Sequence, residues 1–67
     1  MVVDEAEKLM HRTITVACRG GKEFSGRLAS IFLENDYPGE PDAIGLLDGG
    51  VIVSIPLSDI EGFEVVE

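Results

Sequence analysis

The segment Thr13–Leu33 constrains the fold of this 67-residue chain more than any other. Apolar residues occupy every second position on both sides of an Arg-Gly-Gly-Lys turn, which is the period of a β-strand with one buried face. These positions are Ile14, Val16 and Cys18 before the turn, and Phe24, Gly26 and Leu28 after it. The two turn glycines can adopt the positive φ angles of a tight hairpin. The segment therefore predicts a β-hairpin with a glycine on the inner face of its second strand.

Five strands and one short helix are predicted along the chain. The helix covers residues 3–11, with Asp4 as its cap and Glu7 three residues later. The predicted strands are Thr13–Arg19, Glu23–Leu33, Ala43–Leu47, Val51–Ile55 and Gly62–Val66. A type II turn is predicted at Pro38-Gly39, a second hairpin turn at Asp48-Gly49-Gly50, and a 3₁₀ turn at residues 56–60.

The second strand contains two features that bend a sheet. Gly26 has no Cβ, so strands can approach closely there, and the apolar pattern shifts register near Ala29–Ser30 as it does at a bulge. Closing a small barrel requires such bends. We therefore expect one all-β domain over residues 1–67, a strongly bent five-stranded SH3-like barrel whose open end is covered by the N-terminal helix.

The small size of the chain predicts self-association. A domain of this length buries only about 60% of its unfolded surface, yet 45% of the residues are hydrophobic. Residues 51–55 and 62–66 contain no lysine, which would discourage pairing between exposed strand edges. The residues expected at these oligomer edges are Val51, Val53, Ile55, Phe63 and Val65.

The order of these elements resembles the Sm-like (LSm) family of small barrels, in particular small bacterial members of unassigned role. Residues 15–31, TVACRGGKEFSGRLASI, are similar to the first family motif, and residues 53–66, VSIPLSDIEGFEVV, suit its last two strands. The resemblance implies RNA binding after the second strand and between the last two strands. The second region here, Leu57-Ser58-Asp59, contains no cation, and Glu34-Asn35-Asp36-Tyr37 aligns poorly with the first. An RNA site would use Asn35, Asp36 and Tyr37 with Arg19, Lys22 and Arg27.

The charge distribution disfavours nucleic acid. The formal net charge is −8; residues 1–33 carry five basic and four acidic residues, and residues 34–67 carry nine acidic residues and no basic one. Phosphates must be neutralised by Lys or Arg, so any RNA contact depends on the first half. The basic residues there can equally pair with the many acids, within or between subunits. The acidic half fits a protein partner with a basic surface.

The loop over residues 34–42 leaves further alternatives open. Tyr37 can stack on a base or can pack on Pro38 or Pro41 to order the loop. Four carboxylates, Glu34, Asp36, Glu40 and Asp42, lie within nine residues. They can form a solvated acidic rim or a site for a hard cation, although their spacing does not match an EF-hand.

No catalytic, cofactor or metal motif is recognisable. Cys18 falls on the apolar face as a buried thiol, and His11 has no partner at catalytic or metal-binding spacing. No apolar run approaches the length of a membrane span, and the N-terminus lacks the features of a signal peptide. We expect a cytoplasmic, non-enzymatic protein: a homo-oligomeric protein-interaction scaffold or, alternatively, an Sm-like RNA-binding protein.

Overall fold

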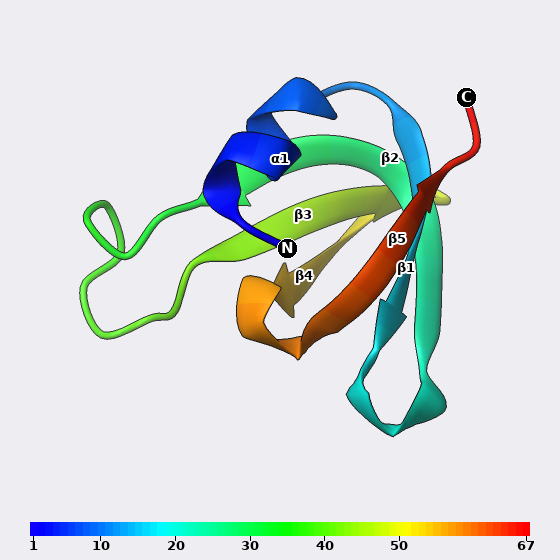
Figure 1. The fold of residues 1–67 in the computed structure, drawn as a ribbon. Coiled ribbons are helices and arrows are strands. Elements are labelled where there is room, and N and C mark those ends of the chain that lie inside the picture. Colours follow the sequence, from blue (N-terminus) through cyan, green and yellow to red (C-terminus); the bar gives the residue numbers. More distant parts are fainter.

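The structure, a computed structural model, describes residues 1–67 (Figure 1). Its elements are α1 (Val3–Lys8), β1 (Thr13–Cys18), the 3₁₀ turn η1 (Arg19–Gly21), β2 (Glu23–Phe32), β3 (Ala43–Asp48), β4 (Val51–Pro56), the 3₁₀ turn η2 (Leu57–Asp59) and β5 (Ile60–Val65). The strands form one antiparallel sheet in the order β4-β3-β2-β1-β5. The predicted five strands and single short helix are confirmed. The sheet is not closed by pairing, because β4 and β5 are its two edges.

The β1–β2 hairpin forms as the alternating pattern predicts. Ile14 and Val16 are fully buried, whereas the residues between them lie on the outer face. Gly20 and Gly21 have φ angles of 79° and 80°, and the Cys18 N–H donates to the Lys22 carbonyl at 2.7 Å. The connection is a 3₁₀ turn, so β1 ends at Cys18 and not at Arg19.

The long strand β2 bends at the two predicted places. At Gly26 an added Cβ would lie 2.6 Å from the Leu47 carbonyl oxygen, so the backbone of β3 occupies the space of a side chain. The register between β2 and β3 shifts between Leu28 and Ser30, as it does at a bulge. These features let β2 curve across the molecule and pair with β1 in its first half and β3 in its second (Figure 1).

The β3–β4 hairpin has a two-residue turn. Asp48 pairs with Val51, and Gly49 and Gly50 have φ angles of 59° and 84°. Positive φ at both central residues is the requirement of a type I′ turn, which matches the twist of the flanking strands. After η2, β5 begins at Ile60, two residues before its predicted start.

The N-terminal helix is shorter than predicted. It ends at Lys8 rather than at residue 11, and His11 has a φ of 70° and donates its N–H to the Leu28 carbonyl at 2.8 Å. The predicted cap is also displaced: the N-cap is Val2, whose N–H donates to the Glu5 carboxylate at 3.0 Å. The chain leaves the helix early because its backbone joins the β2 ladder.

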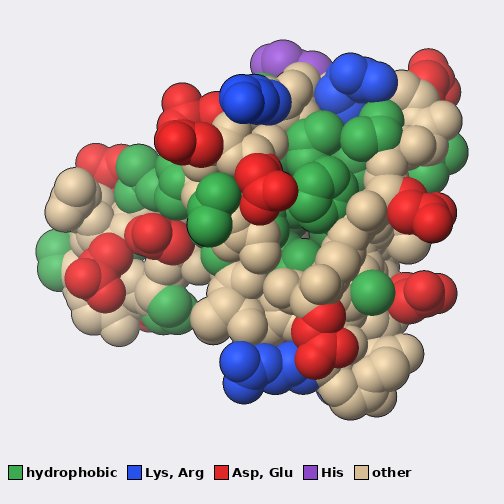
Figure 2. All heavy atoms as spheres, in the orientation of Figure 1, with side chains coloured by type: hydrophobic (Ala, Val, Ile, Leu, Met, Phe, Trp, Pro, Cys, Tyr) green, Lys and Arg blue, Asp and Glu red, His purple; other side chains and the backbone are tan.

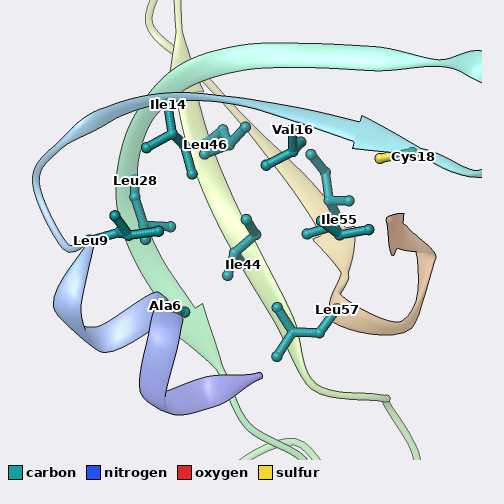
Figure 3. Close-up of a cluster of buried hydrophobic side chains, with 11 residues drawn as sticks. Ala6, Leu9, Ile14, Val16, Cys18, Leu28, Ile44, Leu46, Ile55 and Leu57 are labelled. Carbon is teal, nitrogen blue, oxygen red and sulfur yellow. The ribbon is translucent and has the colours of Figure 1, made fainter. Parts of the chain in front are cut away.

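The core is small and entirely apolar. Only 13 of 67 residues are buried, and none of them is polar or charged. Figure 3 shows side chains from α1, from each of the strands β1 to β4 and from η2, which point toward one another. Ala6 and Leu9 attach α1 to this cluster. Hydrophobic side chains remain visible between α1 and β5 in Figure 2, so the chain does not cover all of its own apolar surface.

Candidate interaction site: two open strand edges

The outer edge of β4 carries backbone groups without a partner in the chain. The Leu57 N–H donates to the Asp42 carbonyl at 3.0 Å, which marks Leu57 and Asp42 as a hydrogen-bonded pair. In the β3–β4 register, Ile55 and Val53 are then the residues of β4 whose backbone groups point toward β3. Hydrogen-bonded residues alternate along an antiparallel strand. The N–H and C=O groups of Ile52 and Ser54 therefore point away from the sheet.

The outer edge of β5 has the same property. The Val66 N–H donates to the Thr13 carbonyl at 2.8 Å, and alternation then directs the backbone of Glu64 toward β1. The backbone groups of Phe63 and Val65 consequently point outward. Their side chains face the core side of the sheet, because they pair with Val16 and Ile14.

The residues predicted at the edges differ in exposure. Val51 and Val65 are 63% and 43% exposed. Val53 and Phe63 are half-buried and pack against the core. Ile55 is a core residue at 3% exposure, so only its strand, and not its side chain, belongs to the edge. Among the edge residues, sequence reasoning omitted Ile52, which is 50% exposed on the outer face.

The gap in the sheet leaves a hollow of about 210 Å³ between the β1–β2 hairpin and β4. Its lining residues are Cys18, Arg19, Lys22, Phe24, Ser54, Ile55, Pro56 and Asp59. Cys18 is buried there, as predicted, and burial raises the pKa of its thiol, with smaller contributions from the carboxylates of Asp59 and Glu61. A raised pKa keeps the thiol protonated and unreactive.

The 34–42 loop projects beyond the ends of β2 and β3 (Figure 1), and residues 34–41 are exposed. The Glu34 N–H donates to Asp42 Oδ1 at 2.8 Å, which closes the neck of the loop. The predicted turn at Pro38-Gly39 is present: Gly39 has a φ of 87°, and the Glu40 N–H donates to the Tyr37 carbonyl at 3.0 Å. The Tyr37 ring meets the Phe32 ring edge to face, with centroids 5.7 Å apart.

The residues proposed for RNA contact do not form one surface. Arg19 and Lys22 lie at the β1–β2 turn, which is distant from the 34–42 loop in Figure 1. Arg27 stands on the outer face between Thr13 and Leu47. Figure 2 accordingly shows basic side chains beside α1 and at the opposite end of the molecule, and none over the loop.

The remaining candidates for ligand chemistry do not converge either. No three His, Cys, Asp or Glu residues, including the four loop carboxylates, lie close enough to hold a metal ion. His11 is exposed. None of the helices has the length and apolar composition that crossing a bilayer would require.

The fold and edges define a small antiparallel β protein with a bent, open sheet and two unpaired strand edges. Comparisons with protein-family models, with curated proteins and with solved structures give no match to this chain. Its role must therefore be inferred from its own surfaces.

Proposed function

We propose that the chain is a subunit of a homo-oligomer in which β4 of one copy pairs with β5 of the next. The observation that carries this proposal is the pair of open edges, one at each end of the sheet. A contact between β4 and β5 is head to tail, so an open assembly keeps one free β4 edge and one free β5 edge until a ring closes.

Burial at these edges would supplement the small core. Full burial of a Val or Ile side chain contributes about 1.5–3 kcal/mol. Val51, Ile52 and Val65 are roughly half exposed, so each would contribute on the order of 1 kcal/mol at an interface. Pairing would also satisfy the outward backbone groups of both edges.

The oligomer serves as a protein-interaction scaffold for a partner with a basic surface. Nine acidic residues and no basic residue lie in the half of the chain that contains both edges. A ring repeats this charge in every subunit, which attracts cationic partners and repels polyanions. The Sm-like alternative, RNA binding, has less support because its basic residues lie apart from the Tyr37 loop.

Substitution of Val51 by Lys tests the assembly. The side chain lies on the inner face of β4, opposite Asp48 and in line with Val53, so a lysine there would be placed against the apolar side chains of the neighbouring β5. Asp48 is the cross-strand neighbour of this position, so association would bury a lysine–aspartate pair in place of an apolar contact. Removing such a pair from water costs about 1–4 kcal/mol more than burying apolar side chains, so Val51→Lys should weaken association by about tenfold or more.

Val2→Lys is the matched control, since Val2 is 61% exposed but belongs to neither edge. Light scattering coupled to size exclusion should give a multiple of the 7.2 kDa subunit mass for the wild type and Val2→Lys. Val51→Lys should give the subunit mass alone. A monomeric wild type, or a Val51→Lys variant of undiminished mass, contradicts the proposal.

A further inference from the structure

The 34–42 loop and the outer face of the sheet line a second, open hollow of about 360 Å³. Phe32, Ala43 and Pro56 stand in one row across β2, β3 and β4, because the register pairs each with the next. Tyr37 and Pro41 of the loop form the facing wall. The volume is at the lower end of the range of ligand pockets, which suits the side chains of a few residues.

The hollow is held in shape by the loop's own contacts. The hydrogen bond from Glu34 to Asp42 fixes both ends of the loop, and the Tyr37 N–H donates to the Leu33 carbonyl at 3.0 Å. The Phe32 ring supports the Tyr37 ring at an interplanar angle of 82°. Tyr37 nevertheless remains 51% exposed, so an aromatic surface faces solvent in a fixed orientation. A pre-organised surface binds without the entropy cost of ordering a loop.

The charge around the hollow selects the kind of ligand. Glu40 lines it, and Asp36 belongs to the same loop. Figure 2 shows acidic and hydrophobic side chains next to one another on the loop, with no basic side chain among them. A phosphate backbone would be repelled here, whereas an apolar segment flanked by Lys or Arg would be complementary.

We infer that this hollow binds an extended, proline-containing basic segment of a partner protein. Grooves walled by aromatic side chains accept proline-rich peptides, whose polyproline II conformation needs little further ordering. Phe32, Tyr37, Pro41 and Pro56 supply such walls, and Glu40 lies at the rim for a flanking cation. The inference deepens the proposed scaffold function and rests on it for the kind of partner, but the hollow is complete within one chain.

A fluorescent peptide of repeated Lys-Pro-Pro units tests the site by polarisation, with the full chain as the receptor. Repeated Glu-Pro-Pro reverses its charge, and repeated Lys-Gly-Gly keeps the charge without the apolar surface. We expect saturable binding of the Lys-Pro-Pro peptide, at least about tenfold tighter than either control. Equal affinity for the Lys-Gly-Gly peptide would mean that the peptide is held by general electrostatic attraction alone, and would overturn the inference. Failure of the Lys-Pro-Pro peptide to bind would also overturn it.

Variants of the hollow locate the site. Tyr37→Ala should weaken binding by about tenfold or more, and Tyr37→Phe should retain it because the ring is kept. Glu40→Lys should weaken binding more than Glu23→Lys, which changes the net charge equally at the start of β2, beside the β1–β2 turn. Backbone amide chemical shifts establish that each variant is folded and should move at Phe32 and Ala43 when peptide is added. Unchanged affinity in Tyr37→Ala overturns the inference.

Two further measurements separate this inference from its alternatives. Binding of oligouridine that displaces the peptide would assign the hollow to RNA and would overturn the peptide inference. Val51→Lys should bind the peptide in its monomeric form, because Val51 does not line the hollow. If the wild type is a monomer that binds the peptide, the assembly is refuted and the docking site stands.

Discussion

Substitution of Gly26 by Ala tests the reason for the curvature of the sheet. The added methyl group would lie 2.6 Å from the Leu47 carbonyl oxygen, 3.1 Å from the Leu47 carbonyl carbon and 3.3 Å from Leu46 Cβ. Two of these atoms are backbone, so β3 itself must move. Overpacking of this kind costs about 1–3 kcal/mol. The cost is large for this chain, because a domain of its length has a free energy of unfolding of only about 3–10 kcal/mol.

Thermal unfolding followed by circular dichroism measures the effect. In a domain of this size each kcal/mol lowers Tm by about 4–8 °C, so Gly26→Ala should melt at least about 4 °C below the wild type. Gly62→Ala is the matched control: Gly62 lies in β5 without a positive φ, and an added Cβ meets no atom within 4 Å. It should leave Tm unchanged or raise it slightly, since alanine restricts the unfolded chain.

All variants must be compared at one protein concentration, because association adds to the apparent stability. Equal Tm values for Gly26→Ala and the wild type would show that β3 does not approach β2 as closely as described. The role of Gly26 as the point of curvature would then be refuted. A Gly62→Ala variant destabilised as much as Gly26→Ala would indicate a general intolerance of β-strand glycines to substitution instead.

Two further predictions concern the thiol and the loop neck. Because the folded state raises the pKa of Cys18, only the unfolded thiol ionises above its usual pKa of about 8.5–9. The free energy of unfolding, measured by urea titration, should therefore fall as the pH rises from about 9. Cys18→Val should flatten this dependence, and an identical slope in both proteins would contradict it. Asp42→Ala should lower the free energy of unfolding by about 0.5–1.5 kcal/mol and speed hydrogen exchange at the Glu34 amide. Asp42→Asn keeps a side-chain oxygen that can accept this bond, so it should have a smaller effect. Unaltered exchange in Asp42→Ala would contradict the role of this bond.

The parts of the fold that sequence predicts well are those with a local cause. The positive φ angles of Gly49 and Gly50, the close approach at Gly26 and the register shift after Leu28 all follow from a residue's own geometry or from the alternation around it. Each of these positions was identified from a few neighbouring residues.

The features that sequence reasoning missed depend on contacts between distant residues. The helix ends early because the His11 N–H bonds to Leu28, and β5 begins early because Ile60 pairs with Cys18 across a register shift. The outer hollow depends on the placement of the 34–42 loop against β3 and β4. Neighbouring residues contain no signal for such contacts, although the aromatic Phe32 just before an acidic, proline-containing loop and Tyr37 within it were available as a clue.

The two proposed interactions share strand β4, so we expect them to be coupled. Ser54 and Pro56 line the outer hollow, and the backbone of Ser54 also points out from the edge to which a second copy would pair. Strand pairing occurs in the plane of the sheet, while the hollow opens on its outer face, so both can be occupied together. Pairing would fix β4 and would bring the outer-face Glu64 of the neighbour beside it, adding negative charge near the peptide. Coupling free energies are reciprocal, so a basic peptide that binds the oligomer more tightly than the Val51→Lys monomer must strengthen self-association by the same factor.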